Sequence, residues 1–172
     1  VHAHEPRRII IIFRTYIMLI GLPASGKSTW AADYIAKNPE MDFRVVSSDA
    51  IIEEKALLEG LTYSASHKKN IGFSIDEMER RFKQYVKDGV NIIHDQTNLT
   101  VNTRKKHLAK VKGYVKSAVI FTLAEEKWRL RFETRKANIG KHIPEFVIKK
   151  MTKNFELPIK KEGFDKVISI KS

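Results

Sequence analysis

Short apolar runs alternate with amphipathic stretches along most of this chain. Five runs are rich in β-branched and aromatic residues and predict strands at residues 16–20, 43–48, 90–94, 114–123 and 166–170. In the stretches between them apolar residues recur at helical spacing, which predicts helices at residues 28–37, from 50 onward, and at 73–86, 101–112, 125–135 and 144–155. Such alternation of strands and helices is typical of an α/β domain with a parallel sheet.

Two stretches do not fit this alternation. Residues 1–15 begin with a polar segment that lacks a signal-peptide layout, and we expect them to form an N-terminal lead or tag-like segment before a domain that spans residues 16–172. Within the lead, the β-prone run 9–13 either lengthens the first strand or forms an extra element. Residues 61–72 show no clean period, so we expect a loop on the substrate side of the domain.

The turn after the first predicted strand carries a phosphate-binding pattern. Residues 21–29 read Gly-Leu-Pro-Ala-Ser-Gly-Lys-Ser-Thr and fill every fixed position of G-x-x-x-x-G-K-[ST]. In such a loop the backbone N–H groups face the phosphates, the lysine reaches the β- and γ-phosphates, and the next hydroxyl binds magnesium. A strand before the loop and a helix after it favour this reading over a glycine-containing turn that binds nothing. We therefore expect a P-loop NTPase or kinase fold with strand order 2-3-1-4-5.

The loop predicts that the chain binds ATP or GTP together with Mg²⁺. The residues expected to contact the nucleotide are Gly21, Pro23, Ala24, Ser25, Gly26, Lys27, Ser28 and Thr29. Of these, Lys27 is also a catalytic candidate and Ser28 is a candidate metal ligand.

Two aspartates follow predicted strands, at the edge of the sheet where α/β proteins bind ligands. Asp49 follows the second strand and is our candidate for the base that accepts the proton of an attacking hydroxyl. Alternatively, it only caps the helix that begins at residue 50. Asp95 follows the third strand and is expected to hold magnesium or order the acceptor hydroxyl, unless it merely caps the turn at residues 97–98.

Two arginines point to a lid. Arg131 and Arg135 lie four residues apart on one face of the helix at residues 125–135, which runs into a loop at 136–144. A lid in this place would present both guanidinium groups to the charge that builds up during phosphoryl transfer. The alternative is a solvated basic helix.

The positive charge is concentrated in one segment. The net charge is +12, and residues 101–161 hold 17 Lys or Arg against 5 Asp or Glu, so this segment contains the whole surplus. A segment this one-sided favours a polyanionic partner, with DNA or RNA the leading candidate, over an ordinary solvated face. We expect Arg104, Lys105 and Lys106 to contribute exposed charges to this surface.

The composition excludes other classes. The chain has no cysteine, which rules out disulfides and thiolate metal sites. No apolar run approaches the roughly 20 residues needed to cross a bilayer. We expect an intracellular, cytoplasmic protein (in the host cytoplasm if it is phage-encoded) with no membrane partner.

These motifs together resemble the polynucleotide 5′-hydroxyl kinase family over residues 16–158. The likeness is to the kinase domain of a phage end-healing enzyme without its phosphatase domain. It implies that Lys27 and Ser28 hold phosphates and magnesium, that Asp49 is the general base, that Asp95 orients the acceptor and that Arg135 contacts the donor phosphates. Further acceptor-binding candidates are Thr97, Asn98 and Arg104.

The chain departs from that family at several points. Ile52 stands where the phage enzyme has an arginine that engages the acceptor's terminal phosphate. Gln96, the lid length and residues 154–158 are more similar to the kinase-like domain of the heterogeneous nuclear ribonucleoprotein U family.

Our leading hypothesis is magnesium-dependent transfer of the ATP γ-phosphoryl group to a polynucleotide 5′-hydroxyl. The alternatives are an ATP-dependent RNA-binding module without kinase activity, and a small-nucleoside or modified-base DNA kinase. The sequence leaves the choice of DNA or RNA and the oligomeric state open.

Overall fold

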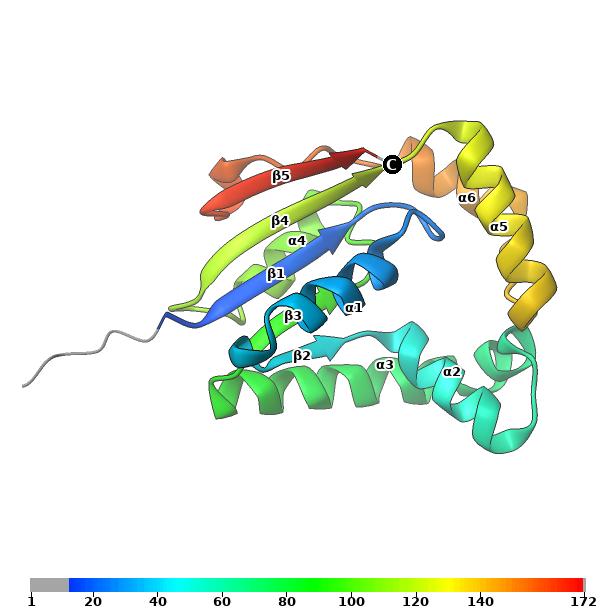
Figure 1. Cartoon of the computed structure of the whole chain (residues 1–172), viewed down its shortest axis with the longest axis horizontal. Helices are drawn as coiled ribbons and strands as arrows, with labels where there is room; N and C mark the ends of the chain where they lie inside the picture. The colour runs from blue at the N-terminus through cyan, green and yellow to red at the C-terminus, as the bar shows by residue number, and fades with distance from the viewer. Residues whose placement is uncertain (1–12, 172) are drawn as a thin grey trace, which may run out of the picture.

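The domain is built on five parallel strands. The computed structural model describes residues 13–171, so residues 1–12, with most of the run 9–13, lie outside the described part. The strands are β1 (Thr15–Ile20), β2 (Phe43–Val46), β3 (Asn91–Asp95), β4 (Val115–Thr122) and β5 (Lys166–Lys171). All neighbours pair in parallel in the order β2-β3-β1-β4-β5, which confirms the predicted α/β fold class and strand order (Figure 1).

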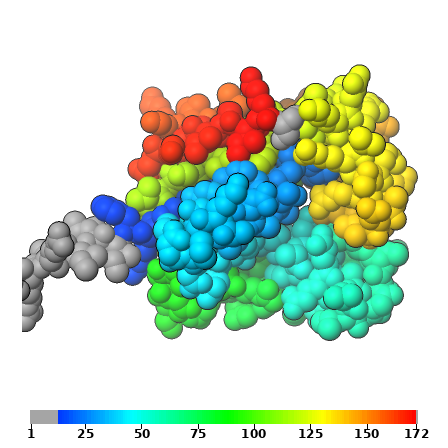
Figure 2. All heavy atoms as spheres, viewed as in Figure 1, coloured from blue at the N-terminus to red at the C-terminus, as the bar shows by residue number. Residues whose placement is uncertain are grey.

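Helices cover both faces of this sheet and its carboxyl edge. They are α1 (Lys27–Lys37), α2 (Ser48–Glu59), α3 (Tyr63–Asp88), α4 (Val101–Leu108), α5 (Glu125–Ile139) and α6 (Glu145–Lys153), with short 3₁₀ turns η1 (Pro39–Met41) and η2 (Lys160–Glu162). Figure 1 places α5 and α6 beyond the ends of the strand arrows, and Figure 2 shows α5 at that end of the molecule, beside α1 and α2. Between residues 13 and 171, no helix has the length and apolar character that a membrane span requires.

The central strand β1 joins two cores. Its residues Tyr16, Met18 and Ile20 face a cluster that includes residues of α3 and α4, whereas Ile17 and Leu19 face a cluster that includes residues of α1. Every residue from Tyr16 to Ile20 is buried. A strand covered on both faces has to be apolar throughout, which explains the unbroken apolar run in the sequence.

The expected loop at residues 61–72 is wrong, because α3 begins at Tyr63. Thr62 caps this helix by accepting a hydrogen bond from the backbone N–H of Ala65 at 3.3 Å. The first turns bury small polar residues against α2, and Ser66 Oγ donates to the carbonyl oxygen of Ile52 at 3.0 Å. Asn70 is buried one turn later. A buried helix face made of polar residues gives no hydrophobic period, so the sequence pattern concealed it.

The observed ends of α4 and α5 also differ from the predicted ones. α4 stops at Leu108 rather than at residue 112, because the following turn inserts Val111 into the core and brings the chain to β4. α5 continues to Ile139 and ends at Gly140, which has a left-handed φ of 65°. The lid loop is therefore shorter than expected, and nearly all of it lies between Gly140 and Pro144.

Arg104 is not part of the exposed basic surface, which corrects our expectation. Its side chain is 0% exposed, and Nε and Nη2 donate to the Glu162 carboxylate at 2.7 and 2.8 Å. Nη1 donates to the carbonyl oxygens of Asn98 and Leu99 at 3.1 and 3.0 Å. The guanidinium therefore joins the loop before α4 to η2, and it cannot reach an acceptor as an exposed charge.

Replacing Arg104 with Ala should lower the free energy of unfolding by about 3–5 kcal/mol, because the Glu162 carboxylate would stay buried without its partner. Urea denaturation measures this loss. The matched control is Lys105→Ala on the exposed face of the same helix, which should change stability by less than about 0.5 kcal/mol. If the Arg104 variant were as stable as the wild type but bound oligonucleotides more weakly, Arg104 would instead belong to the binding surface.

Candidate phosphate-binding and phosphoryl-transfer site

The P-loop closes around its own lysine. Gly26 adopts φ 99°, a conformation that favours glycine, and turns the chain into the first turn of α1. Lys27 is buried, and its Nζ donates to the carbonyl oxygens of Gly21 at 3.0 Å and Leu22 at 2.8 Å. The loop thus places an ammonium group and a helix N-terminus together, which is the arrangement that binds phosphate groups.

The two fixed glycines are also required by their neighbours. A Cβ on Gly21 would lie 2.8 Å from Ser25 Oγ and 3.0 Å from the carbonyl oxygen of Phe121. A Cβ on Gly26 would lie 3.1 Å from Nη1 of Arg131 on α5. The absence of side chains therefore lets the loop pack against β4 and lets the lid arginine approach it.

Burial changes the acid–base behaviour of Lys27. Desolvation lowers the pKa of its ammonium group to about 8, although the carboxylates of Asp95 and Asp49 act in the opposite direction. The charged and neutral forms are therefore both accessible near neutral pH in the protein without a bound anion.

Asp95 meets Ser28 at the mouth of the P-loop. The register of β3 against β1 sets Asp95 opposite Leu19, and Ser28 Oγ donates to Asp95 Oδ2 at 2.7 Å. The nearby turn is held instead by Asn98, whose Nδ2 donates to the carbonyl oxygen of Leu19 at 2.8 Å. The Asp95 carboxylate therefore faces the P-loop hydroxyl and does not cap the turn at residues 97–98.

A hydroxyl beside a carboxylate fits the needs of magnesium. Both groups offer hard oxygen ligands, and Mg²⁺ is commonly bound by one or two such protein ligands together with waters and substrate phosphates. Within residues 13–171 there is no cluster of three or more His, Cys, Asp or Glu side chains that could hold a metal without substrate. Ser28 and Asp95 are therefore the residues that would hold magnesium beside a nucleotide.

Asp49 faces the same cavity from the other side. Helix α2 is capped by Ser47, whose Oγ accepts from the backbone N–H of Ala50 at 3.2 Å, so the Asp49 carboxylate is not the cap. Its Oδ1 accepts from the Tyr63 hydroxyl at 2.7 Å, and its Oδ2 pairs with the ammonium group of Lys141. The side chain remains 52% exposed, which leaves it accessible to a substrate hydroxyl.

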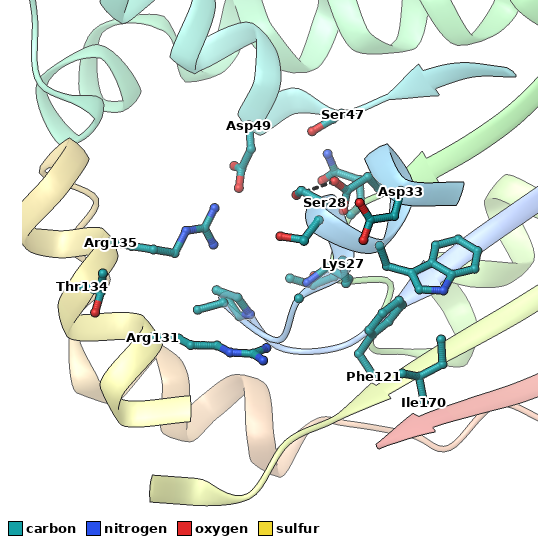
Figure 3. A pocket seen from close by; sticks show the side chains of 18 of the residues that line it. Lys27, Ser28, Asp33, Ser47, Asp49, Phe121, Arg131, Thr134, Arg135 and Ile170 are labelled. Carbon is teal, nitrogen blue, oxygen red and sulfur yellow. Dashed lines mark hydrogen bonds between the residues drawn. The ribbon is translucent and has the colours of Figure 1, made fainter. Parts of the chain in front are cut away.

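The lid arginines line this cavity, which has a volume of about 730 Å³. In Figure 3 the guanidinium group of Arg135 points into the cavity toward Asp49, and that of Arg131 points to the P-loop. Arg131 Nη1 lies 3.5 Å from the carbonyl oxygen of Ser25. Part of the cavity lining is apolar and aromatic, and it includes Trp30, Phe121 and Ile170.

The structure separates the acceptor candidates. Thr97 lines the cavity beside Asp95, whereas Asn98 is 2% exposed and holds the backbone of β1. Arg104 is buried in its ion pair with Glu162. Thr97 is therefore the member of this group that a substrate in the cavity could contact.

The sequence prediction missed several residues of the site. Tyr63 lies in the stretch that we read as a loop, and Lys141 follows the lid helix at a distance of 92 residues from Asp49 along the chain. Trp128 ties α5 to the P-loop because its Nε1 donates to the carbonyl oxygen of Pro23 at 2.7 Å. The Thr62 cap was the available signal for Tyr63; the other two contacts depend on tertiary packing.

The site and fold place the chain in a known family. A family model described as AAA domain, AAA_33, matches residues 17–158, and the chain belongs to this family. The five-stranded architecture is that of P-loop kinases, which confirms the fold that the motifs predicted. A P-loop kinase domain with this loop geometry binds nucleotides.

Relatives in sequence and structure agree with this assignment. Heterogeneous nuclear ribonucleoprotein U-like protein 2 of Homo sapiens is 28% identical over 155 residues, which cover 88% of this chain and 21% of that protein. The chain thus spans about a fifth of the length of this relative. Similarity to a ribonucleoprotein U-like protein was the second resemblance seen in the motifs.

Solved structures of other proteins share the fold. A chain from the Pnkp1/Rnl/Hen1 RNA repair complex has a TM-score of 0.63 and 23% identity, covering 87% of this chain and 46% of the other. Chaetomium thermophilum Kti12 in complex with ADP-AlF3 has a TM-score of 0.61 and 15% identity, covering 91% of this chain and 88% of the other. At these identities the likeness concerns the fold.

The affinity for ATP should fall as pH rises through about 8, because the phosphates bind the charged form of Lys27 and its pKa is lowered to about 8. Above this pH the dissociation constant should increase by up to about tenfold per pH unit. Calorimetric titration between pH 7 and 9.5 measures the effect. In Lys27→Arg the guanidinium group stays charged over this range. The affinity of this variant for ATP, whether high or low, should therefore be independent of pH. An unchanged wild-type affinity up to pH 9.5 would contradict the prediction.

Proposed function

We propose that this domain transfers the γ-phosphoryl group of ATP to the 5′-hydroxyl of a polynucleotide. The observation that carries the proposal is the convergence of three groups on one cavity: the P-loop lysine, the Ser28–Asp95 pair and the Asp49 carboxylate. Nucleotide binding alone needs the first two groups. A half-exposed carboxylate opposite the loop is what a reaction with a hydroxyl acceptor requires in addition.

The proposed reaction balances without a further reagent. The acceptor oxygen forms a bond to the γ-phosphorus while the bond from that phosphorus to the bridging oxygen of ADP breaks, and ADP leaves with the electron pair. Asp49 takes the proton of the hydroxyl as the new bond forms. Lys27 and Arg135 lie where they would face the negative charge on the transferring group. Magnesium, held by Ser28 and Asp95, would supply charge neutralisation on the phosphate oxygens.

The proposal of a nucleic-acid acceptor rests on the exposed basic residues and on the similar proteins. Most cations of residues 101–161 remain exposed once Arg104 and Lys141 are set aside, and they include Lys105 and Lys106 on α4 and Lys136 on the lid. A small acceptor would not need a basic surface of this extent. One structural neighbour belongs to an RNA repair complex, and one sequence relative is named as a ribonucleoprotein.

One observation favours a second function, an ATP-dependent RNA-binding module. Ile52 occupies the position at which the resembled phage kinase carries its acceptor-binding arginine, and in this domain Ile52 is 0% exposed. The acceptor's terminal phosphate would therefore lack that contact. A module that binds RNA without phosphorylating it needs the P-loop and the basic surface but does not need a base.

Labelled ATP offered with 5′-hydroxyl RNA, 5′-hydroxyl DNA, nucleosides and hydroxymethylated duplex DNA decides between these functions. We expect label on an oligonucleotide 5′ end. Lys27→Ala should abolish nucleotide binding and transfer together, whereas Asp49→Asn should retain ATP affinity and reduce turnover by about 10²–10⁴-fold.

The control for the aspartate variant is Asp76→Asn, an exposed carboxylate on α3 outside the cavity, which should transfer at the wild-type rate. Normal turnover by Asp49→Asn would remove the base from the proposal. Label on none of the acceptors would favour the RNA-binding module, and label on nucleosides alone would favour a small-molecule kinase.

Oligonucleotide binding should weaken steeply with salt, because each neutralised phosphate releases condensed counterions with a log–log slope of about −0.7 for single strands. Charge reversal of Lys105 and Lys106 should lower the affinity and make the slope shallower by about 0.7 for each phosphate that the variant no longer neutralises. Fluorescence anisotropy at several salt concentrations measures both. ATP affinity should be nearly unchanged, since it depends on the preorganised P-loop.

The matched control is charge reversal of Lys83, an exposed lysine on α3 outside the basic segment. It should leave the slope as in the wild type. Salt-insensitive oligonucleotide binding would make the basic segment an ordinary solvated face and would favour a small-molecule acceptor.

A further inference from the structure

The chain that follows the lid helix is anchored on the start of α3. Ser64 Oγ donates to the carbonyl oxygen of Gly140 at 2.5 Å and accepts from the backbone N–H of His142 at 3.2 Å. Gly140 packs so closely that a Cβ on it would lie 3.0 Å from Cβ of Thr62. Two hydrogen bonds and a close backbone approach therefore fix the residue between Gly140 and His142.

That residue is Lys141, and its ammonium group is directed at the proposed base. Lys141 is 3% exposed, its Nζ pairs with Asp49 Oδ2, and the same Nζ lies 4.3 Å from the ring centroid of Tyr63. Tyr63 donates its hydroxyl to the other oxygen, Asp49 Oδ1, at 2.7 Å. Each oxygen of the Asp49 carboxylate has a second lone pair that these two contacts do not use. The carboxylate can therefore also accept a hydrogen bond from an acceptor hydroxyl.

We propose that Lys141 is a positioning residue that acts through Asp49. It orients the Asp49 carboxylate toward the cavity and places a positive charge beside that carboxylate when the segment after α5 is docked on α3. The inference rests on the proposed function. It goes beyond it by linking the lid to the base, because the cation that orients Asp49 is supplied by the chain segment that continues from the lid helix.

The charges around Asp49 agree with this role. Burial raises the pKa of Asp49, but the charge and hydrogen bond of Lys141, the hydroxyl of Tyr63 and the charge of Arg135 together hold its pKa below the usual value. Lys27 on α1 adds another positive charge at longer range, and Glu53 on α2 is the nearby negative one that acts on Tyr63. Lys141 provides the largest of the effects that keep the carboxylate ionised.

Lys141→Met, which keeps an unbranched side chain only one atom shorter and removes the charge, is the central variant. We expect turnover at pH 7 to fall by about tenfold or more, a part of the 10²–10⁴-fold that a positioned base contributes, while KM for ATP changes by less than about twofold. Lys141→Arg should recover most of the loss because it restores the positive charge. Lys83→Met, which removes an exposed lysine of α3 outside the basic segment, is the matched control and should behave as the wild type.

The pH profile gives a readout that a purely structural role would not change. Asp49 must be ionised to accept a proton, and removal of the neighbouring cation raises its pKa. The acidic limb of kcat/KM should therefore move to higher pH in Lys141→Met and return in Lys141→Arg. Tyr63→Phe removes one hydrogen bond but no charge and should shift the limb less.

A double-mutant cycle tests whether Lys141 works through Asp49. In the Asp49→Asn background, Lys141→Met should cause no further loss of turnover, because the group on which it acts is already absent. A loss equal to that in the wild-type background would show that Lys141 supports the fold or the substrate independently, and would overturn the proposal.

Direct titration of the Asp49 carboxyl carbon by NMR separates this inference from the proposed function. In the full chain without nucleotide, the pKa of Asp49 should rise in Lys141→Met, or in Lys141→Gln if the methionine variant does not fold. An unchanged Asp49 titration overturns the Lys141 proposal even if phosphoryl transfer is observed. If the wild-type chain labels no acceptor but the Asp49 titration shifts, the proposed function fails while the pairing of Lys141 with Asp49 stands.

Discussion

The register of β3 against β1 is the constraint on which the site depends. With Leu19 opposite Asp95, the two strands end at the same level, and the P-loop that leaves β1 passes directly beside the carboxylate that ends β3. The hydrogen bond between Ser28 and Asp95 follows from this alignment. Because β1 is buried on both faces, a shift in register would displace its side chains from two cores at once. The packing of the sheet therefore secures the geometry of the Ser28–Asp95 pair.

The lid is held differently from the rest of the domain. α5 contains no buried residue, so it contributes little to either core. It is fastened near its two ends, by Trp128 to the P-loop and by the segment at Gly140 and Lys141 to α3 and α2. Elements with few buried apolar contacts open at a low cost in free energy. A helix attached through a few polar contacts suits a position over a cavity that substrate must enter and product must leave.

The basic segment illustrates the difference between charge in sequence and charge in space. Arg104 and Lys141 both belong to the surplus of residues 101–161, but each is buried against one carboxylate and has a local task. Lys105, next to Arg104 in the chain, is exposed. On a helix, neighbouring residues point in directions about 100° apart, so one of two adjacent cations can be buried while the other is exposed to solvent. The number of basic residues in the segment therefore sets an upper limit on the positive charge of the surface, but it does not identify the residues that form that surface.

The sequence by itself determined the local features of this protein: the P-loop between a strand and a helix, the apolar strands, and Asp49 and Asp95 after two of them. These depend on interactions between residues close in the chain, and their patterns are short. Only the tertiary structure decided that Ser66 and Asn70 form a buried helix face, that Arg104 is internal, and that Lys141 meets Asp49 across 92 residues. A polar side chain is compatible with water or with a buried partner, and the partner is provided by the fold, so local pattern cannot distinguish the two.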